Sequence, residues 1–340
     1  MAINSKQARK NKQITRVMIF LCPLVIMLLV TGIVVIIKDT ESEERIQAVY
    51  EDIPVDNNIE TKIIESKDND LGPRPVVWKE NYPVLDSTRT REENEAIRSS
   101  YAETMERYEQ AKKIIEENDI DFSDIKITVL GDSLTDGMGL EDYEKAQYNW
   151  PAQIQRILNC KEVVNMGIIG STVENLKDRD PMCQRWKDID KDSDIIIVMG
   201  GTNDALNQEF YDIGSPEERA ENTFCGDLSK MLKGIKATYQ TQDHYCKLIY
   251  INPPYSGISA AYQAMRPDEF LNQSAYAEAI NEIAVSEGFE VIDLFNNNVL
   301  NSCDGETYEK LYNIDGLHFN KEGYTIMANY IASQIILRIE

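Results

Sequence analysis

The sequence predicts an α/β fold, in which five strands form one parallel sheet inside a doubly wound, three-layer domain. Five short apolar runs rich in β-branched residues recur from residue 125 onward, and segments long enough for a crossover helix separate them. Glycine-rich and polar motifs follow the first three runs, as expected at the carboxyl ends of parallel strands. The expected strands span residues 125–130, 163–165, 195–199, 248–251 and 291–294.

Helix signals lie between these strands. Capping residues, an early proline or an apolar stripe mark each expected helix. The expected helices begin at Trp150-Pro151, at Ser171 with Glu174 and at Ser215-Pro216 with Glu218, and two more span residues 276–285 and 321–336. These elements complete an α/β domain over residues 125–340.

The N-terminus has a different composition. Residues 1–16 are basic, and residues 17–37 contain no charged residue. Those 21 residues suit a bilayer core of roughly 30 Å at about 1.5 Å per residue. We therefore expect a cytoplasmic basic tail followed by one transmembrane helix, and a cleaved signal peptide is the alternative.

The basic residues also set the expected orientation. The flank after Lys38 is acidic, so the positive charges lie before the apolar segment and favour a cytoplasmic N-terminus. The expected location is the plasma membrane, crossed once, with the α/β domain outside the cell. Residues 38–89 are acidic and contain several prolines, and they are expected to form a stalk.

A helical extension is expected over residues 90–124. Thr90 and Glu93 match a capping box, and apolar residues recur at helical spacing after them. This apolar face is expected to pack against the catalytic domain. It consists of Ile97, Tyr101, Met105, Tyr108, Ala111 and Ile115.

Composition excludes some partners. The formal net charge of −23 argues against nucleic acid, because like charges repel. The six cysteines show no CxxC spacing and no histidine cluster, so no metal site is expected. The cysteines outside the apolar segment could form one or two disulfides or remain as buried thiols. Nothing in the sequence implies a cofactor, and the oligomeric state stays open.

Four motifs carry the chemistry. Gly131-Asp132-Ser133 follows the first expected strand, and a glycine-containing segment over residues 165–172 follows the second. Gly201-Thr202-Asn203-Asp204 follows the third strand, and Asp315-Gly316-Leu317-His318 lies near the C-terminus. A serine, an imidazole and a carboxylate are the groups that nucleophilic acyl transfer needs. The chain has only two histidines, and His244 lies in no motif.

In this order, the four motifs resemble the SGNH hydrolases, also called the GDSL esterases and lipases. The resemblance covers approximately residues 125–340 and implies a flavodoxin-like fold. It implies that Ser133 is the nucleophile, His318 the general base and Asp315 the residue that orients it. The implied oxyanion donors are the backbone N–H groups of Ser133 and Gly170 and the side-chain amide of Asn203. Gly170 is preferred because a capped helix is expected directly after it, and Gly167 is the alternative.

Other acidic residues are expected to brace the loops. Asp132 is expected to hold the nucleophile turn by accepting backbone hydrogen bonds, and Asp136 and Asp204 are expected to support the loops around it. Aromatic residues in segments 205–214, 253–273 and 296–314 are candidates for the walls of a pocket.

The resemblance leaves the substrate open. The expected location favours removal of O-acetyl or other short acyl groups from a carbohydrate outside the cell. One alternative is hydrolysis of lipid acyl esters, including lysophospholipids. The other is a surface module that transfers acyl groups or only binds them.

Overall fold

The computed structural model describes residues 91–241, 244–259, 271, 273–297, 299–300, 307, 310–313 and 315–339, with backbone only for residues 91–100. The membrane helix and the stalk expected before residue 90 lie outside the described residues. None of the helices that the structure describes is long and apolar enough to cross a membrane.

Five parallel strands form one sheet in the order β2-β1-β3-β4-β5. The strands are β1 (Lys126–Gly131), β2 (Glu162–Gly167), β3 (Ile195–Met199), β4 (Lys247–Asn252) and β5 (Glu290–Asp293). The bounds confirm all five expected strands to within a few residues. This order places β1 between β2 and β3, so the loops after these three strands share one edge of the sheet.

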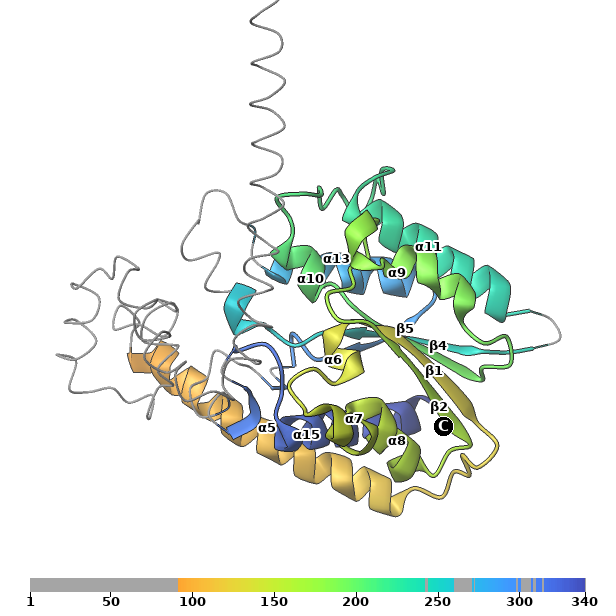
Figure 1. Ribbon diagram of the computed structural model, residues 1–340. Coiled ribbons are helices and arrows are strands. Elements are labelled where there is room, and N and C mark those ends of the chain that lie inside the picture. Colours follow the sequence, from red (N-terminus) through yellow and green to blue (C-terminus); the bar gives the residue numbers. More distant parts are fainter. Residues whose placement is uncertain are drawn as a thin grey trace, which may run out of the picture. The chain divides into compact units, whose positions relative to one another are not determined.

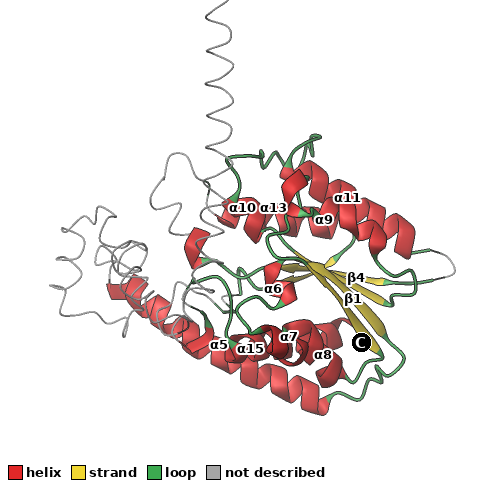
Figure 2. Ribbon diagram, viewed as in Figure 1, coloured by secondary structure: helices red, strands yellow, loops and turns green. Residues whose placement is uncertain are grey.

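Helices cover both faces of the sheet (Figures 1 and 2). On one face lie α5 (Arg91–Glu117), α7 (Asp142–Tyr148), α8 (Trp150–Leu158) and α15 (Lys321–Ile339). On the other lie α9 (Met182–Arg185), α10 (Thr202–Leu206), α11 (Phe224–Tyr239) and α13 (Gln273–Ser286). A four-residue helix, α6 (Ser133–Asp136), and two 3-10 turns, η2 (Lys177–Arg179) and η3 (Trp186–Asp188), complete the described elements.

Alternate residues of the strands face opposite cores. Ile127 and Val129 of β1 pack with residues of α8 and α15, whereas Leu130 packs with residues of α11 and α13. Both faces of β1 and β3 are buried, which explains why β3 is a continuous apolar run, whereas the edge strand β2 is partly exposed.

Helix α5 packs on α15 at the outside of the first helical layer. Ala111 is buried, and Tyr101, Met105, Tyr108 and Ile115 pack against the core on this side. The described part of the expected apolar face therefore contacts the catalytic domain.

The helix expected to begin at Ser171 is wrong. Residues 171–176 are irregular, and a single 3-10 turn, η2, follows them. Ser171 does not cap a helix, because its hydroxyl donates to the carbonyl of Asp180 at 2.7 Å. The backbone N–H groups of Val173 and Glu174 donate to the carboxylate of Asp204 at 2.9 to 3.1 Å. Tertiary hydrogen bonds have replaced the helical ones.

The helix expected at Ser215 is also wrong, because residues 216–218 form only a single hydrogen-bonded turn. The Ser215 hydroxyl accepts from the backbone N–H of Glu217 and of Glu218, as a cap does. Arg219 and Asn222 then adopt positive φ angles of 51° and 60°, which end the turn. The long helix, α11, begins at Phe224.

Candidate active site

Ser133 lies where β1 turns into α6. Asp132 is the N-cap of α6, and its Oδ1 accepts a hydrogen bond from the backbone N–H of Leu134 at 2.9 Å. This contact confirms the bracing role expected for Asp132. Gly131 is required here, because a Cβ at this position would lie 2.0 Å from Oγ1 of Thr135. As the first residue of α6, Ser133 has a backbone N–H with no carbonyl partner inside its own helix.

His318 lies in a short loop before α15, and Asp315 shapes that loop. Oδ1 of Asp315 accepts from the backbone N–H of Leu317 at 3.0 Å and of His318 at 2.9 Å. The other oxygen, Oδ2, is 2.5 Å from Nδ1 of His318. These contacts fix the ring orientation and make Nδ1 the protonated nitrogen of the neutral imidazole.

The free ring nitrogen of His318 faces the serine. Nε2 is 2.8 Å from Oγ of Ser133, although the two residues are 185 positions apart in the sequence. Ser133 is 4% exposed and His318 is 5% exposed, so this hydrogen bond is sheltered from bulk water. The structure thus brings together all three residues in the order acid, imidazole and hydroxyl.

Two opposing influences act on the carboxyl of Asp315. Burial raises its pKa, but the charge of His318 and the hydrogen bonds from His318 and Leu317 lower it more. The net pKa lies below the ordinary value for an aspartate. Asp315 is therefore ionised at neutral pH and can stabilise a protonated His318.

Residues 168–174, here called the β2 loop, lie beside the nucleophile turn. The backbone N–H of Ile168 donates to the carbonyl of Gly131 at 3.2 Å. Gly170 adopts a positive φ of 75°, and its N–H makes no hydrogen bond within the described residues. This free N–H can donate a hydrogen bond to a negatively charged ligand atom.

Gly167 has a different role. Its N–H donates to Oδ1 of Asn165 at 2.8 Å, so it is already used. A Cβ on Gly167 would lie 2.3 Å from the backbone nitrogen of Asp136, which shows close packing against α6. The geometry favours Gly170 over Gly167 as a donor, although the helix expected after Gly170 is absent.

Asn203 links α10 to the β2 loop. Its side-chain amide donates one N–H to the carbonyl of Ser171 at 3.0 Å. The amide nitrogen carries a second hydrogen, which has no partner among the described residues. Asn203 is half-buried, so this second N–H is available to a ligand.

Two side chains, the buried Asp204 and the half-buried Arg185, hold the β2 loop. Asp204 receives the hydrogen bonds from Val173 and Glu174 described above, which confirms the bracing role expected for it. Arg185 donates from Nη1 to the carbonyl of Met166 at 2.8 Å and from Nη2 to the carbonyl of Gly131 at 3.0 Å. No sequence signal points to Arg185, because it lies in no motif and its partners are mostly backbone carbonyls.

Glu174 is an unusual buried acid. It is fully buried, and neither of its carboxyl oxygens has a hydrogen-bond partner within the part of the chain that the structure describes. Burial raises its pKa, and the charges of Asp204 and Asp227 raise it further. Glu174 is therefore protonated at neutral pH.

The remaining expected groups lie apart from this site. Asp136 pairs with Lys145 at 2.8 Å, close to the end of α6. His244 bonds the carbonyl of Ser193 through Nε2 at 2.9 Å in a loop before β4. The cysteines that the structure describes are free thiols, namely Cys160, Cys183, Cys225 and Cys246.

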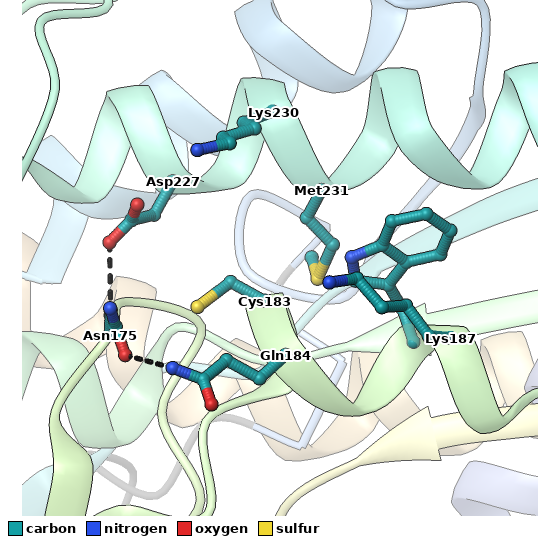
Figure 3. A pocket seen from close by; sticks show the side chains of 8 residues that line it. Asn175, Cys183, Gln184, Lys187, Asp227, Lys230 and Met231 are labelled. Carbon is teal, nitrogen blue, oxygen red and sulfur yellow. Dashed lines mark hydrogen bonds between the residues drawn. The ribbon is translucent and has the colours of Figure 1, made fainter.

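Two cavities lie near the segments that follow the motifs. One of about 380 Å³ lies between residues 175–187 and α11, and Figure 3 shows the side chains around it. Another of about 460 Å³ is lined by Phe210 and Tyr211 together with Leu271 and Tyr276. The expected pocket segment 205–214 does line a cavity, whereas Tyr262, Phe270 and Tyr308 lie outside the described residues.

Comparisons with known proteins identify the family. The sequence model of the GDSL-like lipase/acylhydrolase family matches residues 129–326. A crystal structure of a Lactobacillus plantarum protein is 24% identical, with a TM-score of 0.54, over 63% of this chain and 97% of that one. This likeness supports the fold.

Two further solved structures are similar at lower scores. A lipase/acylhydrolase from Enterococcus faecalis is 23% identical, with a TM-score of 0.45, over 63% of this chain and 96% of that one. An acetyl xylan esterase from Geobacillus stearothermophilus is 22% identical, with a TM-score of 0.42, over 64% of this chain and 97% of that one. Among curated proteins no match was found.

Proposed function

Because this chain belongs to the GDSL-like lipase/acylhydrolase family, and is thus a hydrolase of the esterase type, we propose that Ser133, His318 and Asp315 are its catalytic triad. One observation carries the proposal, namely the continuous hydrogen-bond path from Asp315 through His318 to the Ser133 hydroxyl. An imidazole oriented by a carboxylate can remove the proton of a serine hydroxyl at neutral pH.

The proposed reaction has two halves. Nε2 of His318 accepts the proton of Ser133 while Oγ attacks the carbonyl carbon of the ester. The protonated His318 then gives that proton to the oxygen of the departing alcohol, which leaves an acyl group on Ser133. His318 then takes a proton from a water molecule whose oxygen attacks the acyl carbon. It returns that proton to Oγ of Ser133 as the bond between Oγ and the acyl carbon breaks and the acid leaves.

Three donors are proposed to stabilise the negative oxygen of the tetrahedral intermediates. They are the backbone N–H groups of Ser133 and Gly170 and the second N–H of the Asn203 amide. Support comes from the arrangement of the strands, because β2 and β3 flank β1 and their loops share its edge of the sheet. The N–H of Gly170 and the second N–H of Asn203 are also free of other partners among the described residues.

The proposed substrate is a carbohydrate that carries O-acetyl or other short acyl groups, encountered outside the cell. The cavity beside residues 205–214 presents the aromatic rings of Phe210 and Tyr211 next to polar Gln208 and Asp212, a mixture suited to sugar rings. The outward orientation rests on the charge pattern of residues 1–38 and stays a prediction.

A chain-length series tests the proposal. The full-length protein in detergent is assayed with p-nitrophenyl esters from acetate to palmitate, and with acetylated xylan and acetylated peptidoglycan. We expect turnover of short esters, release of acetate from at least one glycan, and loss of both in Ser133→Ala. Preference for long chains would instead indicate lipid hydrolysis, and full activity in Ser133→Ala would disprove the triad.

A further inference from the structure

Arg179 lies over the β2 loop, although no motif includes it. It is the last residue of η2, and its Nη1 is 3.3 Å from the position that a Cβ on Gly170 would occupy. Its Nη2 donates to Oδ1 of Asn207 at 3.1 Å. The guanidinium group therefore lies next to the proposed oxyanion donor Gly170.

Asn207 ties this arginine to α10. The Asn207 side-chain amide donates to the carbonyl of Asn203 at 2.6 Å, and its backbone N–H donates to the same carbonyl at 3.0 Å. Asn207 is also largely buried, at 8% exposure. One end of the Arg179 guanidinium is thus fixed by the turn that carries Asn203.

The segment that carries Arg179 is anchored on both sides. The backbone N–H of Asn175 donates to the carboxylate of Asp227 on α11 at 2.9 Å. The side-chain amide of Gln184 donates to Oδ1 of Asn175, and Figure 3 shows both hydrogen bonds. On the other side of η2, Arg185 binds the carbonyl groups of Gly131 and Met166. Arg179 therefore lies in a segment, residues 175–185, that hydrogen bonds hold at both ends.

No carboxylate neutralises Arg179. It forms no ion pair among the described residues, and Asn207 is the only hydrogen-bond partner of its guanidinium group there. Other cations of the domain use their N–H groups: Lys126 pairs with Asp190 and Arg219 with Glu287, and Arg185 donates to the carbonyls of Gly131 and Met166 and to the Ser171 hydroxyl. Arg179 differs from them, because most of its guanidinium N–H groups have no partner among the described residues.

We propose that Arg179 binds a carboxylate of the substrate, such as that of an acidic sugar, close to the ester that is cleaved. A guanidinium group has five N–H donors and binds carboxylates through two parallel hydrogen bonds. The net negative charge of the protein repels anions at long range, but salt screens charges beyond about 8 Å. The nearby charge of Arg179 therefore has more influence on the binding of an anion at this site than the net charge has. This inference rests on the proposed esterase function and specifies its substrate class.

Matched pairs of esters test the proposal. One pair is 4-acetoxybenzoate and its methyl ester, which places the charge on the alcohol side. The other is p-nitrophenyl hydrogen succinate and p-nitrophenyl methyl succinate, which places it on the acyl side. In Arg179→Gln we expect the ratio of kcat/KM for charged over neutral ester to fall about tenfold or more in at least one pair.

Two controls sharpen this test. Arg156→Gln removes an exposed arginine of α8 and should leave both ratios as in the wild type. Arg179→Lys keeps the charge without the paired donors and should retain part of the preference. Equal loss on charged and neutral esters, or unchanged ratios in Arg179→Gln, would overturn the proposal.

A binding experiment separates this proposal from the esterase function. Both charged esters are titrated onto Ser133→Ala and onto Ser133→Ala with Arg179→Gln, so that neither variant needs to turn over. A dissociation constant about tenfold weaker in the second protein supports carboxylate recognition. Equal constants overturn it, whatever the result of the activity assays.

Discussion

The two sides of the site are held in different ways. On the histidine side, Ser133, His318 and Asp315 contact one another through their own side chains at 2.8 and 2.5 Å. On the glycine side, formed by the β2 loop and Asn203, the contacts run from side chains to the backbone. Asp204 accepts from two backbone N–H groups, and Arg185 donates to backbone carbonyls.

The two sides therefore depend on different properties of the chain. The histidine side requires three specific chemical groups, so one substitution removes its function. The glycine side requires a backbone shape, which several charged residues stabilise together. Mutations on the histidine side should therefore act mainly on turnover, whereas mutations on the glycine side should act on both turnover and stability.

The largest effect is expected from His318→Ala. Without the imidazole, the serine hydroxyl has no base, and kcat for p-nitrophenyl acetate should fall by about 10⁴-fold or more. His244→Ala is the matched control, because it removes the other histidine of the chain and should keep the wild-type rate. Wild-type activity in His318→Ala would contradict the proposal that His318 is the base for Ser133.

Asn203→Ala should have the next largest effect. It removes one proposed oxyanion donor while the triad remains, and the expected fall in kcat is on the order of 10² to 10³. The change should appear in kcat more than in KM, because the negative oxygen exists only during reaction. A change confined to KM would assign Asn203 to substrate binding instead.

Arg185→Lys tests whether the glycine side is held through its backbone. A lysine has one nitrogen and cannot reach the carbonyls of Gly131 and Met166 together with the Ser171 hydroxyl. We expect about tenfold lower kcat and a loss of about 1 to 3 kcal/mol in the free energy of unfolding. Urea denaturation and initial rates measure both. Loss of activity at unchanged stability would contradict the comparison.

The smallest effect is expected from Glu174→Gln and concerns pH. The raised pKa of Glu174 means that the folded chain keeps a proton that the unfolded chain loses above its ordinary pKa. The stability linked to this proton is complete in acid and declines as the pH rises. Between about pH 5 and pH 8, the wild type should lose about 1 kcal/mol or more relative to Glu174→Gln. Thermal melts that shift equally in both proteins would show that Glu174 does not titrate in this way.

The sequence predicts the five strands, and it predicts that Ser133, Asp315 and His318 lie together, because each of these features has a local signature. The five apolar runs match the buried strands, and Ser133, Asp315 and His318 are rare side chains within short motifs. The helix expected at Ser171 failed for a physical reason. The capping residues are present, but Asp204 takes the N–H groups that would have begun the helix.

Arg179 and Arg185 were missed for a related reason. Their partners are backbone atoms or an asparagine remote in sequence, and no spacing rule connects them to the motifs. The sequence favours Gly170 over Gly167 as an oxyanion donor because it predicts a helix after Gly170, and that helix does not form. The structure supplies another reason, since the N–H of Gly167 is used by Asn165 whereas that of Gly170 is free within the described residues.

The separation of 185 positions between Ser133 and His318 has a consequence for folding. The serine is positioned by β1, whereas the histidine reaches it only after β5 has joined the sheet and α15 has packed against it. A partly folded chain holds a serine without its base and cannot cleave esters. Recovery of hydrolysis after dilution from urea therefore reports the completion of the whole domain, and it should lag behind the recovery of helical signal.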